Sequence, residues 1–247
     1  MRKRQSRKVI LFIVEGLTEL TALEGILQVL FESSTAEVYV TYGDQFTDEE
    51  VPIKKKVGDI LNGFLAKKKL HKKDIERIII LTDTDGCFID DSCIQENLNL
   101  PRSTNYYFND RIETWSKNNI SKRNAIKSRN LSTVAGMEKV CDIPVEMYYF
   151  SCNLDHVLFG LNNLTDEEKT QYAEDFSLEY ADREEEFLPF IFKHLPKESF
   201  SYSDSWKFIK VDTHSLKRFS NFFYVFKTHK SEVGPLAQQK ISSLIES

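Results

Sequence analysis

Two carboxylates one residue apart are the strongest candidates for chemistry in this sequence. Asp83 and Asp85 follow the apolar run 78–81, which is rich in β-branched residues, after Thr82, and Gly86 ends the segment. Such a run is typical of a buried strand, and alternate residues of an extended chain point the same way. We therefore expect both carboxylates to project together from the strand end. Because like charges repel each other, the pair requires a cation, and Mg²⁺ (or Mn²⁺) is the oxygen-seeking choice.

A third carboxylate, Glu15, ends another apolar run at residues 8–14. The segment between the two motifs is predicted to form helix, strand and helix, at about residues 20–31, 37–41 and 53–70. This alternation predicts an α/β fold with a mostly parallel sheet flanked by helices. The carboxyl ends of parallel strands meet at one edge, where functional groups collect. Glu15, Asp83 and Asp85 are thus predicted to lie on one rim as catalytic residues and metal ligands.

A basic segment at residues 102–140 interrupts this alternation, and aromatic residues are interleaved with its charges. Such a composition suits contacts with phosphates and stacking on bases. An amphipathic helical insertion that packs its aromatics inward explains the composition equally well. The candidate nucleic-acid-binding residues are Arg111, Lys122, Arg123, Lys127 and Arg129, together with Lys207 farther along the chain.

Another acidic residue, Asp155, follows the strand predicted at residues 144–150. Asn153 is expected to cap the next helix, which places Asp155 in its first turn. A carboxylate is favoured there by the helix dipole whether or not it binds metal. Asp155 is therefore a candidate metal ligand whose presence a purely structural role explains as well.

The chain divides by composition into residues 1–160, the predicted α/β domain, and residues 161–247, an aromatic-rich helical region. We expect the second part to pack as a C-terminal appendage, with a homodimer interface as an open alternative. The net charge is −5, the cysteines form no C-x-x-C pair, and no apolar run approaches the roughly 20 residues that span a bilayer. A cytoplasmic location without membrane partners is the expectation.

The motifs F-I-V-E-G-L-T-E at 12–19 and I-I-L-T-D-T-D-G at 79–86 resemble the acidic motifs of the TOPRIM domain, which topoisomerases, primases and several nucleases share. V-E-G-x-T-E, together with S-C-N-L-D-H-V-L at 151–158, is similar to the OLD-like and RloB-like TOPRIM nucleases of bacterial antiphage defence, such as the effectors of PARIS-type systems. The resemblance covers residues 8–160. Asp155 departs from it, since glutamate is more usual there.

The resemblance implies a Mg²⁺-dependent nuclease that hydrolyses phosphodiester bonds in RNA, tRNA included, or DNA, as a toxin-like effector in antiphage defence. Glu15 would be a metal ligand or general acid/base, and Asp83 and Asp85 would hold the ion. No phosphate-binding G-x-x-x-x-G-K-S/T motif occurs, so an ATPase of such a system would be a separate chain.

Two other functions remain open at this stage. One is a non-catalytic sensor or binding subunit whose partner supplies the activity. The other is a small-molecule phosphotransferase or phosphatase that uses the first aspartate of the pair as its nucleophile, although the glutamate-glycine turn would then be unexplained.

Overall fold

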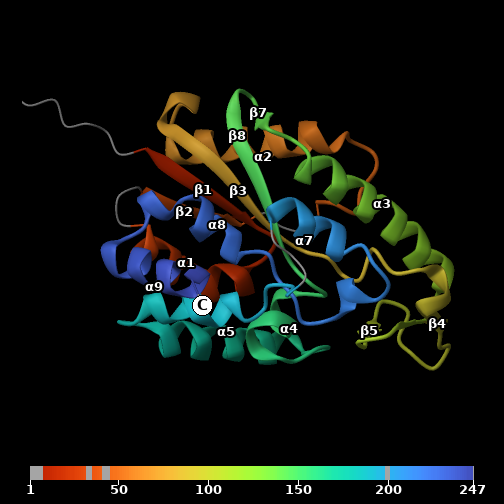
Figure 1. Cartoon of the computed structure of the whole chain (residues 1–247). Coiled ribbons are helices and arrows are strands. Elements are labelled where there is room, and N and C mark those ends of the chain that lie inside the picture. The colour runs from red at the N-terminus through yellow and green to blue at the C-terminus, as the bar shows by residue number, and fades with distance from the viewer. Residues whose placement is uncertain (1–7, 32–34, 41–44, 198–200, 247) are drawn as a thin grey trace, which may run out of the picture.

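A mostly parallel sheet forms the centre of the molecule (Figure 1). The computed structural model describes residues 8–31, 35–40, 45–197 and 201–246. Among these residues the main sheet has five strands in the order β2-β1-β3-β8-β7, and only β7 runs antiparallel to its neighbour. The strands are β1 (Val9–Val14), β2 (Thr35–Val40), β3 (Ile75–Asp83), β7 (Lys139–Val140) and β8 (Ile143–Phe150). The predicted α/β architecture is confirmed.

Helices cover both faces of this sheet. Figure 1 shows α2 and α3 along one side and α1, α5 and α9 along the other. The α-helices are α1 (Leu17–Leu30), α2 (Ile53–Lys68), α3 (Lys117–Ala135), α4 (Leu154–Phe159), α5 (Asp166–Tyr180), α6 (Phe187–Phe192), α7 (Tyr202–Phe208), α8 (Phe223–Thr228) and α9 (Pro235–Glu246). Within the described part of the chain, no helix has the length and apolar character that crossing a membrane would require.

β1 is apolar throughout, and β3 is apolar over residues 78–81, because both faces of these strands are buried. Ile10 and Phe12 of β1 pack into the core beneath α1, whereas Leu11 and Ile13 pack into the core beneath α2. β3 divides in the same way, with Ile79 on the first face and Ile78 and Ile80 on the second. A continuous apolar run thus supplies two cores, which holds the carboxyl ends of β1 and β3 rigidly side by side.

A second sheet of three short strands lies in the segment between β3 and α3. Its order is β4-β6-β5, with β4 (Ile94–Glu96), β5 (Asn105–Tyr107) and β6 (Ile112–Thr114). A small apolar cluster that includes Ile94, Ile112 and Ile120 joins this sheet to α3. The basic segment at 102–140 is therefore only partly helical, and α3 is its main element.

The C-terminal region is helical, as expected, but it packs into both cores instead of forming an appendage. Phe187 and Phe226 pack against the α1 face, whereas Trp206 and Ile209 pack against the α2 face. A backbone bridge also joins Ser220 to Phe150 at the end of β8. The aromatic side chains of this region are thus buried against the sheet, and this burial explains their abundance.

Acid should weaken this C-terminal packing through His194. Burial, reinforced by the positive charge of Arg218, lowers the pKa of His194 from 6.5 to about 4. The unfolded chain therefore binds a proton more readily than the folded chain between these values, so stability should fall as the pH drops from 6.5 towards 4. We expect His194→Gln to show a shallower loss of urea resistance over this interval. An identical pH profile for the variant and the parent protein would contradict the prediction.

Candidate active site

The carboxyl ends of β1 and β3 bring Glu15 against the DTD motif. The strands are parallel neighbours in which Ile13 is paired with Ile80. The Thr82 hydroxyl donates a hydrogen bond to Glu15 Oε1 at 2.5 Å, and the Asp83 backbone N–H points to the same oxygen at 3.3 Å. Two donors from β3 therefore fix the carboxylate of Glu15, which was predicted to share a rim with Asp83.

Asp83 is the most strongly perturbed carboxyl group of this rim. Its Oδ1 atom accepts a hydrogen bond of 2.9 Å from the backbone N–H of Leu154, at the start of α4. Burial raises its pKa well above the ordinary value, and the negative charges of Glu15, Glu19 and Asp85 raise it further. The positive charge of Lys127 lowers the pKa of Asp83 but does not outweigh burial and the three neighbouring acids.

Asp85 faces α3 and is positioned by a turn. β3 ends at Asp83, and Asp85 has a left-handed backbone with φ +47°. Its N–H donates to the carbonyl oxygen of Cys152 at 2.7 Å. The expectation that strand alternation aims Asp83 and Asp85 the same way is therefore wrong, because the extended chain stops between them. A turn tied to the end of β8 places Asp85 in the cluster.

A buried ammonium group lies between two of these acids. Lys127 of α3 has no exposed surface, and its Nζ forms a short ion pair with Asp85 Oδ2 and lies 3.9 Å from Glu15 Oε2. Burial alone would raise the pKa of Asp85, but the positive charges of Lys127 and Arg123 outweigh it and lower that pKa. Arg123 also donates to the backbone carbonyl oxygen of Asp85 at 2.8 Å. The positive charges of Lys127 and Arg123 thus favour the ionised form of Asp85, whereas burial favours the neutral form of Asp83 nearby.

Glu19 was not predicted to be a site residue, although it is the last residue of the V-E-G-x-T-E motif. Its carboxylate folds back over the start of α1, where a Cβ on Gly16 would lie 2.9 Å from Glu19 Oε2. Burial raises its pKa, and the negative charge of Asp155 contributes to the shift. We call Glu15, Glu19, Asp83 and Asp85 the acidic cluster.

Asp155 lies beside this cluster, at the predicted place in the first turn of α4. Asn153 caps the helix by accepting a hydrogen bond of 2.8 Å from the His156 N–H, as expected. The nearest cation to Asp155 is Lys169 of α5, whose Nζ lies 3.7 Å from Oδ2. Burial raises the pKa of Asp155, and its buried Oδ1 has no hydrogen-bond partner among the described residues. Its possible role as a metal ligand stays a prediction.

The basic residues predicted to contact nucleic acid fall into two groups. Arg123 and Lys127 lie at the acidic cluster, whereas the others pair with acids elsewhere: Arg111 with Glu113 at 2.9 Å, Lys122 with Glu49 at 3.5 Å, Arg129 with Glu49 at 4.0 Å and Lys207 with Asp204 at 2.9 Å. The Arg111–Glu113 pair is half-buried, whereas the other three pairs are more exposed, and exposed ion pairs contribute little to stability. Nucleic-acid contact by these four side chains remains a prediction.

The helical periodicity of α3 distinguishes Arg123 and Lys127, which lie at the acidic cluster, from Lys122, which does not. Arg123 and Lys127 lie on the same face of α3 as the buried residues Ile120 and Leu131. Residues three and four apart share a helix face, so a basic residue in the apolar stripe points inward. Lys122 falls outside that stripe.

The donor set suits a hard divalent cation in type and charge, since the cluster offers only carboxylate oxygens in a half-buried setting. Within the residues that the structure describes, no group of three or more His, Cys, Asp and Glu side chains is arranged so that it could hold a metal ion. The ammonium of Lys127 supplies positive charge between Glu15 and Asp85 in this arrangement. The predicted Mg²⁺ site is therefore matched in chemistry but not in the present positions of its carboxylates.

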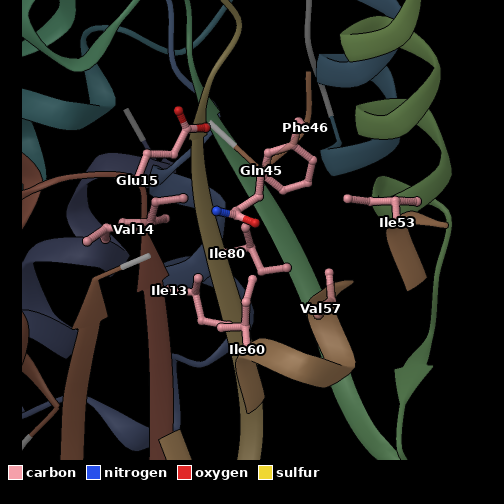
Figure 2. Close-up of a pocket in the computed structure, with 10 residues that line it drawn as sticks. Ile13, Val14, Glu15, Gln45, Phe46, Ile53, Val57, Ile60 and Ile80 are labelled. Carbon is pink, nitrogen blue, oxygen red and sulfur yellow. The ribbon is translucent and has the colours of Figure 1, made fainter. Parts of the chain in front are cut away.

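A small cavity behind Glu15 offers no alternative site. Figure 2 shows the Glu15 carboxylate above the apolar side chains of Ile13, Ile60 and Ile80. The cavity measures about 10 Å³, which is at most enough for a single water molecule.

The turn that carries Asp85 requires glycine at position 86. Gly86 has φ +64°, and an added Cβ would lie 2.4 Å from Leu216 Cδ2. We expect Gly86→Ala to lower the free energy of unfolding by more than the roughly 1–2 kcal/mol that a left-handed backbone alone costs. The measurement is urea unfolding followed by circular dichroism.

A glycine-to-alanine substitution at a position with open space serves as the control for Gly86→Ala. A Cβ added at Gly25, within α1, would meet nothing within 4 Å. Gly25→Ala should therefore raise stability by about 0.5–1 kcal/mol. Equal stability of Gly86→Ala and the parent protein would contradict the role assigned to the turn.

Comparison with known proteins identifies no relative of this chain. No protein-family model, no curated protein and no solved structure matches the chain. The functional argument therefore rests on the residues themselves.

Proposed function

We propose that this chain is a divalent-cation-dependent nuclease of TOPRIM type that hydrolyses phosphodiester bonds in RNA or DNA. The observation that carries the proposal is the acidic cluster, in which Glu15 and Asp83 from neighbouring strand ends meet the turn that holds Asp85. Clustered carboxyl groups with perturbed pKa values at the carboxyl edge of a parallel sheet are costly to the fold and typical of functional sites. A toxin-like role in antiphage defence, with a separate ATPase chain, belongs to the same proposal through the TOPRIM resemblance.

The side chains at the acidic cluster have different roles in the proposed reaction. Glu15 and Asp85 would be the anionic oxygen donors for Mg²⁺ or Mn²⁺, with Asp83 and Glu19 beside them. When bound, the ion would neutralise the charge of the phosphate and lower the pKa of a water molecule. The high pKa of Asp83 suits a group that holds or releases a proton. Arg123 and Lys127 provide positive charge on the α3 side.

Asp83 is poorly suited to the phosphatase alternative. A nucleophilic carboxylate must be ionised and accessible. Burial and the neighbouring acids favour the neutral form of Asp83, and its Oδ1 is already bonded to the Leu154 N–H. The DTD motif therefore supports metal-dependent hydrolysis better than covalent catalysis.

The second candidate function is a non-catalytic binding subunit. It is favoured by one observation, namely that Lys127 already pairs with Asp85 and so reduces the need for a metal ion. A chain that had lost catalysis could keep such an ion pair as a structural contact.

One assay separates the two functions. The purified protein is incubated with tRNA, total RNA and plasmid DNA, in Mg²⁺ and in EDTA. The nuclease proposal expects products only in the presence of the cation. Absence of products from every substrate in Mg²⁺ and in Mn²⁺, with binding retained, would favour the binding subunit.

A further inference from the structure

A polar pocket of about 310 Å³ lies next to the acidic cluster. It is bounded by β5, by the residue that caps α4 and by the loop that leads into α5. Its lining includes Tyr106, Tyr107, Asn153, Asn163 and Lys169. Its volume falls at the lower end of the roughly 300–1,000 Å³ range of small-ligand sites, a size that suits one nucleotide.

Several contacts join this pocket to the cluster. Lys169 lies 3.7 Å from Asp155 and helps to lower the pKa of Asp85. The Tyr107 hydroxyl accepts a hydrogen bond of 2.8 Å from Arg123, which also bonds to the Asp85 carbonyl oxygen. Asn153 immediately precedes Leu154, whose N–H donates to Asp83. The pocket and the acidic cluster therefore share a wall.

Two hydrogen bonds between Asn163 and Tyr107 hold this wall of the pocket in place. The Asn163 side chain accepts from the Tyr107 N–H at 2.8 Å and donates to the Tyr107 carbonyl oxygen at 3.0 Å. This two-point contact ties the loop before α5 to β5. The opening is thus set by fixed hydrogen bonds, and a ligand need not order it on binding.

The lining groups match the parts of a nucleotide. Tyr106 is one of the exposed aromatic residues, at 36%, and offers a face for base stacking. Asn153 uses its side-chain oxygen to cap α4, and its amide hydrogens are not part of that bond. The Lys169 side chain is 36% exposed and carries the cation that a phosphate requires.

We propose that this pocket binds one unpaired nucleotide of the nucleic acid, with its base on Tyr106 and its phosphate directed to the Lys169 side. The inference rests on the proposed nuclease function and specifies its substrate: a single-stranded or extruded nucleotide next to the bond that is cut. Segments with unpaired bases, in RNA or DNA, should therefore be cleaved in preference to continuous duplex.

Binding can be tested without catalysis. In EDTA, the affinities of the nucleoside monophosphates AMP, CMP, GMP and UMP and of their deoxy forms are measured by calorimetry and compared with ribose 5-phosphate, which lacks a base. We expect at least one nucleotide to bind at least fivefold tighter than ribose 5-phosphate. Tyr106→Ala should weaken nucleotide binding about fivefold or more, and Tyr106→Phe, which keeps the stacking face, should restore it.

Tyr172 provides a matched control, since it is 39% exposed, stacks on Phe159 and does not line the pocket. Tyr172→Ala should leave nucleotide affinity unchanged. Equal affinity for nucleotides and ribose 5-phosphate, or equal loss in Tyr106→Ala and Tyr172→Ala, would overturn the proposed nucleotide pocket. Differences between the ribose and deoxyribose series would show whether RNA or DNA fits the pocket.

The outcome is independent of the nuclease assay. Tyr106-dependent nucleotide binding without cleavage of any substrate would support the pocket and contradict the nuclease proposal. Cleavage that ignores base pairing and the Tyr106 side chain would support the nuclease and overturn the pocket.

Discussion

The Asp83→Asn and Glu15→Gln variants should lose nuclease activity by at least about 100-fold. Loss of groups that merely orient metal ligands already costs roughly 10–100-fold, and these substitutions remove charged members of the acidic cluster. Both amides preserve the local contacts, because asparagine still accepts from the Leu154 N–H and glutamine still accepts from the Thr82 hydroxyl. The measurement is the initial rate of cleavage in Mg²⁺ on the best substrate of the series.

Asp59→Asn serves as the control for this comparison. Asp59 forms an exposed ion pair with Lys55 at 3.0 Å on α2, so its replacement removes the same charge from an exposed position outside the cluster. Its activity should match that of the parent protein. Equal rates for Asp83→Asn and Asp59→Asn would contradict the assignment of the cluster as the active site.

The stability of Asp83→Asn should move in the opposite direction to its activity. A raised pKa means that folding disfavours the ionised carboxylate, so a neutral amide at this position should raise the urea midpoint at pH 7.5. A variant that is inactive and more stable is the pattern expected when a fold retains a costly group for function. Lower stability would indicate that the Asp83 carboxylate serves the fold.

Replacing Lys127 with methionine should produce the largest change in stability. The substitution keeps a long apolar side chain but removes the buried ammonium, which leaves Asp85 and Glu15 without that cation. Breaking one partner of a buried ion pair costs about 3–5 kcal/mol, and the lower end applies here because the Asp85 side chain is 22% exposed. In EDTA we expect the free energy of unfolding to fall by about 3 kcal/mol.

Divalent cations should then rescue this variant. An ion that binds only the folded chain stabilises it by about 2.7 kcal/mol at 100 times its dissociation constant. Lys127 and Mg²⁺ would both neutralise the negative charge of Glu15 and Asp85. Mg²⁺ should therefore raise the melting temperature of Lys127→Met more than that of the parent protein. Equal shifts in the two proteins would contradict competition between the ammonium and the metal ion.

The double variant Lys127→Met with Asp85→Asn completes this test. Removing both charges leaves only the more distant Glu15 carboxylate without the ammonium, so stability in EDTA should recover most of the loss, whereas the response to Mg²⁺ should shrink. A double variant as unstable as Lys127→Met alone would show that the lysine acts through packing and not through its charge.

Local sequence determined the elements that carry the site. Apolar runs of the right length specified β1 and β3, since residues buried on both faces of a sheet must be apolar on both faces. Asn153 specified the start of α4 because its short polar side chain caps a helix irrespective of the surrounding fold. The meeting of Glu15 with Asp83 also followed from sequence, through the rule that parallel strands end on the same edge.

Only the tertiary structure decided how the charges are arranged around those strand ends. Lys127 and Lys122 are the same residue type on the same helix. Lys127 is nevertheless buried against Asp85, whereas Lys122 pairs with Glu49 at the surface. A lysine can be buried only where a carboxylate from elsewhere in the chain compensates its charge, and such long-range pairing leaves little local trace. The sequence likewise predicts that Asp85 projects beside Asp83 from the strand end, whereas the hydrogen bond of its turn to Cys152 accompanies a left-handed backbone at Asp85.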